Sequence, residues 1–537
     1  MDTKIQLLDC TLRDGAYIVD GEFGVSTIRG IIKRLQDAKV EIIECGWLKD
    51  APHKYGTTFY HEPNDILQYM SAPKDLNATY VVMIDYNRYN LENLPPCDGR
   101  TIDAIRVVFP KDKVDEGLAL AEPIRKKGYR VFFQAANTLA YSDTEVLSLI
   151  EKVNKVKPEA ISIVDTFGAM YGEDLTRIMS LFVHNLDHDI KIGLHSHNNL
   201  QMSFALAIQF VDALVTKQRS IIVDASLCGM GRGAGNANSE LVIGFLNKKY
   251  KKDYDVNLII DTIDTYMTQF LNKYEWGYSI PYYISGTYQS HVNNIAYLIK
   301  NHKTKSRDLK NIIESLSETN RQGYDYENLE EVYLDYMTKE IDDAGAKEAL
   351  KDVLMTKNVV IIAPGSSAFK KIEEVKEYIT KHNSITIGVN SILEGYDYDY
   401  LFFSNAMRYD YAKESYPEIF NGTKKIITSN IDVKSEESEY IINFNNLIKR
   451  GWKHFDNAMF LCLRLMDYII PAEVAIVGFD GYDSGANYFD KNLEIGVSTA
   501  EKEVFNNDLR EMMKDFVETT NSHLNLNFIT RSRFEVK

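Results

Sequence analysis

The chain has 537 residues, of which 45% are hydrophobic and 26% are charged, a composition typical of globular proteins. At about 100–200 residues per domain, this length predicts several units, with an α/β barrel counting as one larger unit. The 61 basic and 77 acidic residues leave a net charge of −16. This acidic excess argues against nucleic acid or an anionic membrane as the main partner, and it is compatible with a small substrate.

The cysteines and the N-terminal segment predict a cytoplasmic protein. No CxxC pattern occurs, so we expect neither a disulfide framework nor a structural zinc site. The first residues, "MDTKIQLLDCTLRDG", lack a cationic start followed by an apolar core, and no apolar run approaches the roughly 20 residues of a membrane span. The five cysteines are widely scattered: Cys10, Cys45, Cys97, Cys228 and Cys462.

The N-terminal part alternates short apolar runs with segments of helical periodicity. Eight such runs predict parallel strands that close a (β/α)8 barrel over residues 1–252. The helix expected after the third strand has a weak pattern. The predicted strands cover 5–11, 41–46, 79–85, 104–110, 130–136, 160–166, 190–197 and 220–226.

The rest of the chain predicts two further parts. Residues 253–348 contain helical patterns around an aromatic-rich connector, which we interpret as a helical annex of the barrel. Residues 349–537 alternate strands and helices again, beginning with "NVVIIAPGSSAFKK" and including "VAIVGFDGYD". This pattern predicts a Rossmann-like α/β domain with an open, doubly wound sheet whose strand order the pattern does not define.

The stretch "GLHSHNNL" (193–200) predicts a metal site. His195 and His197 share one face of a strand, at the barrel end that carries active sites. Two imidazoles suit a divalent cation that also takes a carboxylate, which Asp14 after the first strand can supply. Asp9 and Asp20 are competing acids. Asn236, in the glycine-rich "GMGRGAGN" (229–236), can add an amide oxygen.

Three motifs together resemble the DRE-type TIM-barrel metallolyases, and within them the 4-hydroxy-2-oxovalerate aldolases. They are "TLRDG" (11–15), "GLHSHNNL" and "GMGRGAGN", and the resemblance covers about the first 300 residues. It implies manganese or magnesium held by Asp14, His195 and His197, with Asn236 as ligand or support. It also implies cleavage or formation of a C–C bond next to a 2-oxo acid through a pyruvate enolate, which Arg13 stabilises.

The resemblance further implies an aldehyde as second substrate, and either a homo-oligomer or a dehydrogenase partner that consumes the aldehyde. At one position the chain departs from this pattern, because Tyr17 stands where these aldolases have an acid/base histidine. The alternatives are a metal-bound water, or Tyr283 or His291 in the annex. Glu44 and Asp165, at ends of predicted strands, are expected to bind substrate.

Other functions remain open at this point. The synthases that condense acetyl-CoA, such as isopropylmalate and homocitrate synthase, are the first alternative. An inactive barrel that scaffolds a C-terminal transferase is the second. Hydroxymethylglutaryl-CoA lyase is disfavoured, because its glycine-rich loop carries a catalytic cysteine, whereas Cys228 precedes the loop here.

The C-terminal part predicts a nucleotide or nucleotide-sugar site. Gly365, Ser366 and Ser367 stand at a predicted helix N-terminus, where free N–H groups favour phosphate, although serine is also an ordinary helix cap. Asp480, at the end of a buried strand, is expected to meet a nucleotide-bound metal. The region faintly resembles the Rossmann domains of sialyltransferase-like and pterin diphosphokinase-like proteins. A bifunctional chain of this kind would serve surface-glycan biosynthesis.

Overall fold

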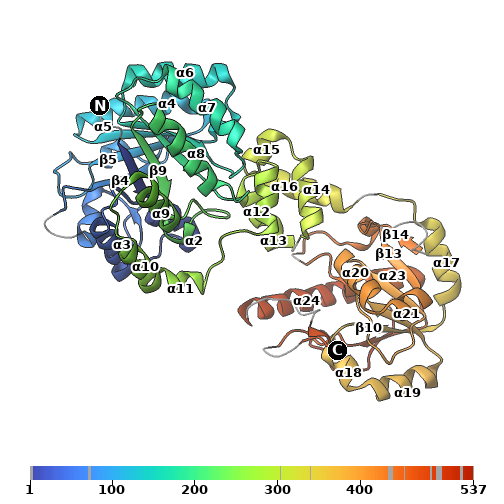
Figure 1. Cartoon of the computed structure of the whole chain (residues 1–537). Helices are drawn as coiled ribbons and strands as arrows, with labels where there is room; N and C mark the ends of the chain where they lie inside the picture. The colour runs from blue at the N-terminus through green and yellow to red at the C-terminus, as the bar shows by residue number, and fades with distance from the viewer. Residues whose placement is uncertain are drawn as a thin grey trace. The chain divides into compact units, whose positions relative to one another are not determined.

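The computed structural model divides the chain into two compact units, Met1–Tyr326 and Glu327–Lys537 (Figure 1). It describes residues 4–70, 74–302, 304–338, 340–432, 440–452, 454–483, 487–491, 499–520 and 524–535. In this range no helix is both long enough and apolar enough to cross a membrane. The five cysteines are unpaired.

The first unit contains a closed barrel of eight parallel strands, which confirms the predicted fold. Neighbouring strands pair in chain order, and β1 pairs with both β9 and β2 to close the cylinder. The two-residue strand β3 (Phe59–Tyr60) pairs with β2 outside this set. The barrel strands are β1 (Ile5–Asp9), β2 (Ile42–Leu48), β4 (Thr79–Asp85), β5 (Ala104–Phe109), β6 (Arg130–Ala135), β7 (Ala160–Asp165), β8 (Lys191–Ser196) and β9 (Ile221–Ala225).

Amphipathic helices cover the outside of the barrel (Figure 1). Helix α6, for example, begins with a capping box of Ser142 and Glu145 and buries Val146, Leu149 and Ile150. Between β4 and β5 the chain forms only the short 3₁₀ turn η2 (Leu91–Asn93), where the sequence pattern is weak. The other helices are α3 (Val25–Asp37), α4 (Val114–Ala119), α5 (Ala121–Lys126), α6 (Asp143–Val156), α7 (Gly172–Asn185), α8 (Ser203–Thr216) and α9 (Ser239–Tyr250).

Short segments after the strands and a run of helices after α9 complete the first unit. Residues of helices α12 and α13 line the large cavity described below. The short segments are α1 (Thr11–Asp14), α2 (Ala16–Val19), η1 (Pro63–Tyr69), η3 (Lys111–Lys113), η4 (Thr138–Ala140) and η5 (Leu227–Gly229). The later helices are α10 (Val256–Thr262), η6 (Ile263–Met267), α11 (Thr268–Leu271), α12 (Ile280–Thr287), α13 (Val292–His302), α14 (Ser306–Ser315) and α15 (Glu318–Gln322). Helix α16 (Tyr326–Met337) begins at the last residue of the first unit and belongs to the second.

The second unit is built on a seven-stranded parallel sheet in the order β14-β13-β12-β11-β10-β15-β16. The chain runs outward from β10 to β14 and then returns beside β10, so the order reverses between β10 and β15, as in doubly wound sheets. The strands are β10 (Asn358–Ile362), β11 (Ile385–Val389), β12 (Tyr400–Phe403), β13 (Lys424–Thr428), β14 (Tyr440–Ile442), β15 (Glu473–Val477) and β16 (Leu526–Phe528).

Helices flank this sheet, and one of them, α23, is buried along most of its length. Most apolar positions of these strands are fully buried, as expected for a parallel sheet covered on both faces. The helices are α17 (Ala344–Leu354), α18 (Ser366–Lys370), α19 (Ile372–His382), α20 (Ala406–Ser415), α21 (Pro417–Gly422), α22 (Phe444–Leu447), α23 (Ala458–Ile469) and α24 (Thr499–Thr519).

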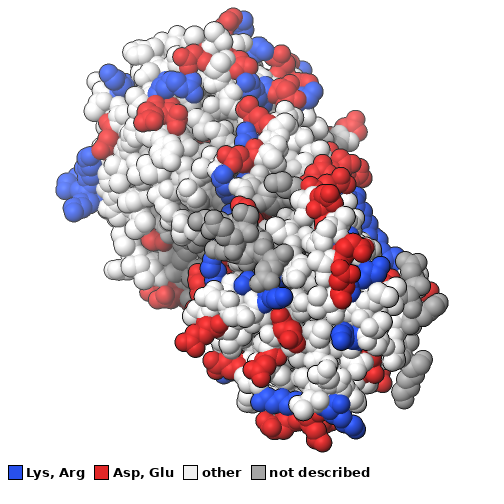
Figure 2. Space-filling model, turned by 90° about the vertical axis from the view of Figure 1, so that its right-hand side faces the viewer, with Lys and Arg blue, Asp and Glu red and all other residues white. Residues whose placement is uncertain are grey.

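Acidic and basic side chains are intermingled on the face of the molecule shown in Figure 2.

Candidate active site

The predicted metal ligands lie at the C-terminal end of the barrel. Strand β1 ends at Asp9, earlier than predicted, and the chain turns into α1, so Asp14 lies on a helical turn instead of a strand end. The Asp9 carboxylate accepts hydrogen bonds from the backbone N–H of Thr11 (2.9 Å) and from the hydroxyl of Ser239 (2.7 Å). Asp9 therefore connects α1 to the start of α9, and both of its carboxylate oxygens already accept hydrogen bonds.

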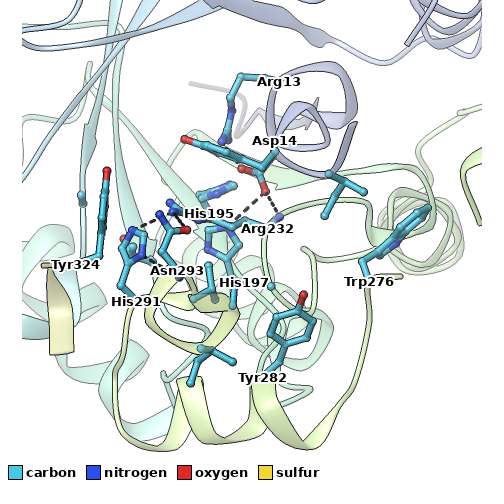
Figure 3. Close-up of a pocket in the computed structure, with 18 of the residues that line it drawn as sticks. Arg13, Asp14, His195, His197, Arg232, Trp276, Tyr282, His291, Asn293 and Tyr324 are labelled. Carbon is cyan, nitrogen blue, oxygen red and sulfur yellow. Dashed lines mark hydrogen bonds and ion pairs between the residues drawn. The ribbon is translucent and has the colours of Figure 1, made fainter. Parts of the chain in front are cut away.

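Asp14, His195 and His197 form a buried cluster that can hold a metal ion (Figure 3). Their ligand atoms all lie within 4.8 Å of one another, and the residues are 1%, 4% and 8% exposed. Asp20, the other competing acid, is exposed at the end of α2. Of the three acids considered, Asp14 is therefore the one that joins the histidines.

Neighbouring groups orient both imidazoles. His197 Nδ1 lies 3.1 Å from the backbone oxygen of Asp165 and donates a hydrogen bond to it. In this tautomer the lone pair of the neutral ring is on Nε2. That Nε2 is buried and has no hydrogen-bond partner in the described parts of the chain. On the other ring, His195 Nδ1 lies 3.1 Å from Asp224 Oδ2. Burial lowers the pKa of His195 to about 4, so this imidazole is neutral near pH 7 and available as a ligand.

Asn236 joins the cluster from the glycine-rich loop. Its Nδ2 donates a hydrogen bond of 2.8 Å to Asp14 Oδ2. Its Oδ1 is buried and accepts no hydrogen bond from any residue that the structure describes. An unsatisfied buried amide oxygen beside a carboxylate and two imidazoles is a donor atom suited to a cation.

A buried network of charges surrounds the cluster. Arg13 donates to Asp14 and, over 2.8 Å, to Glu44, while Arg106 donates to Glu44 over 2.7 Å and to Asp224. Burial alone would raise the pKa values of Asp14 and Asp224, but the adjacent guanidinium groups hold both below their usual range. Three carboxylates thus face two guanidinium groups, and a divalent cation would offset the excess negative charge. Charge and donor set both fit such an ion.

A cavity of about 1110 Å³ opens beside the cluster. Its volume lies above the range of about 300–1,000 Å³ that is usual for ligand pockets. The barrel supplies Arg13, Asp14, His195 and His197 to its lining, and the helices after α9 supply aromatic and polar side chains. Those labelled in Figure 3 are Trp276, Tyr282, His291, Asn293 and Tyr324.

Two of the three predicted acid/base residues line this cavity. Tyr17 packs edge-on against Trp47, and the Arg232 guanidinium lies 4.8 Å from the centre of its ring. Tyr17 is 48% exposed, and desolvation raises the pKa of its hydroxyl, which therefore stays protonated near neutral pH and is a poor base. The predicted Tyr283 is 45% exposed and is not part of the lining, where the preceding residue, Tyr282, is found instead.

His291 also lines the cavity. Its Nε2 lies 2.9 Å from Arg232 Nη2, and its Nδ1 lies 3.2 Å from the backbone nitrogen of Asn293. Both neighbours are donors, and a neutral imidazole has only one accepting nitrogen, so only one of these contacts is a full hydrogen bond. Burial and the charge of Arg232 lower the pKa of His291 to about 3. The ring is therefore neutral at physiological pH.

The residues predicted to bind substrate, Glu44 and Asp165, are buried beneath the cavity and are not part of its lining. Glu44 holds Arg13 and Arg106, as described above. The Asp165 carboxylate accepts the backbone N–H groups of Ala169 (2.9 Å) and Met170 (3.1 Å). Both oxygens of Asp165 are therefore occupied, whereas Glu44 uses Oε2 for both arginines and its buried Oε1 has no hydrogen-bond partner among the described residues.

The sequence motifs did not lead us to three further candidate residues of the site: Arg106, Asp224 and Arg232. The first two are charged residues in the middle of apolar strands, in "AIRVVFP" and "SIIVDAS". A buried charge needs a partner, so each was a visible signal of an internal ion pair. Arg232 stands inside the glycine-rich motif and could have been identified as a cation beside the predicted metal.

In the second unit, the N–H groups predicted to bind phosphate are not free. The N–H of Ser366 donates to the backbone oxygen of Asn487 (3.0 Å), and that of Ser367 donates to the Asp480 carboxylate (2.8 Å). The Ser367 hydroxyl also donates to Asp480. An acidic side chain of the chain itself therefore stands where the phosphate was expected, and α18 has only five residues.

Comparison with known proteins shows which proteins the barrel is similar to. Residues 110–266 match the family described as HMGL-like, which confirms the resemblance to DRE-type metallolyases. A 4-hydroxy-2-oxovalerate aldolase from Moorella thermoacetica is 24% identical over 275 residues, covering 50% of this chain and 78% of that protein.

A second curated protein and a solved structure are also similar to this chain. Oxaloacetate decarboxylase from Mycobacterium tuberculosis is 24% identical over 245 residues, covering 45% of this chain and 70% of that protein. Among solved structures, the carboxyl transferase domain of pyruvate carboxylase from Rhizobium etli is 14% identical and covers 65% of each chain, with a TM-score of 0.49.

Proposed function

We propose that this protein is a divalent-metal-dependent aldolase that cleaves or forms a C–C bond next to a 2-oxo acid through a pyruvate enolate. The observation that carries the proposal is the buried cluster of Asp14, His195 and His197, which opens into a large cavity at the catalytic end of the barrel. The aldolase relative supports the reaction class. Mn²⁺ or Mg²⁺ is the proposed ion, held by these three residues with Asn236 beside them.

The bound cation would act as Lewis acid toward the oxygens of the 2-oxo acid. In the synthetic direction a C–C bond forms between the enolate carbon of pyruvate and the aldehyde carbon, and the aldehyde oxygen gains a proton. In cleavage the hydroxyl on the future aldehyde carbon loses its proton and becomes the carbonyl oxygen, the same C–C bond breaks, and its pair of electrons stays on the enolate. Arg13 is held beside Asp14 by Glu44, so its fixed positive charge can stabilise the enolate oxygen in both directions.

The chain's own groups also handle protons and water. We propose that Tyr17, which lines the cavity and stays protonated near neutral pH, supplies the proton to the aldehyde oxygen. The cluster itself is buried, and aromatic side chains from the segment after α9 line the cavity beside it, which limits the access of water to the reacting groups. We confine the proposed activity to the first unit, because the N–H groups expected to bind a nucleotide in the second unit are occupied. The five unpaired cysteines support the cytoplasm as its compartment.

A second candidate is the decarboxylation of oxaloacetate, which is favoured by the oxaloacetate decarboxylase relative. Loss of CO₂ from oxaloacetate leaves the same pyruvate enolate, so the cluster and Arg13 would serve both reactions. Release of CO₂ from oxaloacetate, measured beside aldol addition to pyruvate, distinguishes the two candidates.

Proton exchange of pyruvate tests the shared step without an aldehyde. We expect the protein with Mn²⁺ to exchange the methyl protons of pyruvate in D₂O, and His195→Ala to abolish the exchange. His184→Ala is the matched control, because His184 is exposed on α7. Absence of exchange in the metal-loaded wild type, or exchange that survives His195→Ala, would contradict the proposal.

A further inference from the structure

We infer that the aldehyde substrate carries an anionic group, a carboxylate or a phosphate, and that Arg232 binds it. This inference rests on the proposed function and names the substrate class of the same site. Arg232 belongs to the glycine-rich loop that also supplies Asn236, and its side chain lines the cavity (Figure 3).

The structure fixes the Arg232 side chain in place. Its Nη2 lies 2.9 Å from His291 Nε2 and 3.0 Å from Asn293 Oδ1, and the guanidinium packs over the ring of Tyr17. Its backbone N–H donates to Asp14 Oδ2 over 3.3 Å. The guanidinium is therefore held from several sides, close in the chain to the metal cluster.

Part of this guanidinium remains for a ligand. Neither Nε nor Nη1 donates a hydrogen bond to another residue of the described chain, and no carboxylate in the described ranges forms an ion pair with Arg232. His291, its nearest ring partner, is neutral and does not compensate its charge. A fixed guanidinium with unused donors is the group that proteins use to bind carboxylates and phosphates.

The charges around the cavity agree with an anionic ligand. Arg88 and Lys300 also line it, and its carboxylates are Asp14, Asp85 and Glu275. Asp14 is paired with Arg13, and Asp85 lies 3.6 Å from Arg88. Of the other charged residues in the lining, Arg232 and Lys300 stand against one carboxylate, Glu275. The excess negative charge of the buried cluster around Asp14 is the part that the bound cation would offset.

The size of the cavity also suggests a longer aldehyde. Pyruvate and an ion fill a small part of about 1110 Å³. The remaining wall carries Trp276, Tyr282 and Tyr324, whose rings offer apolar faces and whose polar atoms suit hydroxyl groups. An aldehyde of only two carbons would leave both this wall and Arg232 unused.

Aldol addition of pyruvate to matched aldehydes tests the inference. Succinic semialdehyde and butanal differ in a carboxylate, and glyceraldehyde 3-phosphate and glyceraldehyde differ in a phosphate, so the two pairs distinguish the anions. With the Mg²⁺-loaded protein, we expect kcat/KM to be about 10- to 100-fold higher for the anionic member of at least one pair, the range of charge-assisted hydrogen bonds.

Variants of Arg232 separate binding from a structural role. Arg232→Gln should remove most of the preference, mainly through KM for the anionic aldehyde, and Arg232→Lys should restore part of it. Arg177→Gln is the control, because Arg177 forms a surface ion pair with Asp143. Equal loss for charged and neutral aldehydes in Arg232→Gln, or a wild type that prefers the neutral members, would overturn the inference.

A binding measurement gives an answer that does not depend on turnover. Two of the three tryptophans, Trp47 and Trp276, line the cavity, so their emission should change when an aldehyde binds. We expect saturable changes with the anionic aldehydes that Arg232→Gln weakens. No such change would overturn the inference, whereas failure of pyruvate to exchange its protons would contradict the proposed function itself.

Discussion

Asp224 on β9 places a carboxylate oxygen 3.1 Å from Nδ1 of His195 on the adjacent strand β8. Asp224 is itself held by Arg106, which crosses the barrel interior to Glu44 and so reaches Arg13. The groups proposed to bind the metal and to stabilise the enolate are thus connected through buried side chains of the barrel. The orientation of His195 depends on a residue that does not touch the cavity.

Asp224→Asn should therefore weaken metal binding without removing a ligand. An amide is a weaker partner for the Nδ1 proton, and loss of such a partner typically costs 10- to 100-fold in metal affinity. We expect this loss in a calorimetric titration with Mn²⁺. Asp189→Asn, at an exposed position, should bind as the wild type does. Unchanged affinity in a folded Asp224→Asn protein would show that this carboxylate does not orient the ligand.

Gly231→Ala should disturb the cluster directly. A methyl group at Gly231 would collide with Asp14 Oδ2 and Asn236 Nδ2, so both side chains would have to move. We expect at least about a tenfold loss of Mn²⁺ affinity, comparable to loss of an orienting partner. Gly244→Ala is the control, because a methyl group there meets no atom within 4 Å and lies on helix α9. It should keep the wild-type affinity.

Arg13→Lys should lower the rate of pyruvate proton exchange. A lysine keeps the charge but not the planar fork that contacts Asp14 and Glu44 together. We expect exchange to fall about 10²- to 10³-fold, the usual cost of losing an oxyanion-stabilising donor. Metal content, measured by elemental analysis, should stay close to that of the wild type. A variant with normal exchange would exclude Arg13 from the reaction.

The raised pKa of Asp9 predicts that the free energy of unfolding depends on pH. Burial raises its pKa to about 6, whereas the unfolded carboxyl titrates near 4. Between these values the folded chain keeps a proton that the unfolded chain has released, so the free energy of unfolding falls as pH rises from 4 to 6. Asp9→Asn removes this titration. Relative to the variant, the wild type should lose up to about 3 kcal/mol over this interval, at 1.36 kcal/mol per unit.

Urea titrations followed by tryptophan emission provide this measurement, because Trp47 and Trp276 lie in the first unit. If the difference in unfolding free energy between the wild type and Asp9→Asn does not change with pH, the raised pKa of Asp9 is contradicted. A difference that grows in the opposite direction would indicate that Asp9 is stabilised in its charged form.

The eight barrel strands could be predicted because parallel strands are buried on both faces and give continuous apolar runs. The cluster of Asp14, His195 and His197 followed from the position of strand ends in such a barrel. The helical turn that carries Asp14 was not predictable, because its first backbone bonds depend on the Asp9 carboxylate and on Ser239, far along the chain. Long-range side-chain contacts of this kind leave no local pattern.

Several predicted site residues lie outside the cavity or are already hydrogen-bonded, for similar reasons. The Gly365–Ser367 segment has the composition of an anion site, but Asp480, 113 residues after Ser367, occupies its donors. Tyr283 and Tyr282 are adjacent, and which of them faces the cavity depends on how α12 packs on the barrel unit. Glu44 and Asp165 were expected to face substrate because both lie near strand ends, whereas both are buried and lie outside the cavity lining, with donors on Glu44 Oε2 and on both oxygens of Asp165.

An anomalous-difference map from crystals soaked in MnCl₂ tests the central claim most directly. The account predicts one strong peak coordinated by the Asp14 carboxylate and by nitrogen atoms of His195 and His197, with Asn236 Oδ1 beside it. A map with no peak at these residues, or with Asp14 turned away from both imidazoles to contact Arg13 alone, would contradict it.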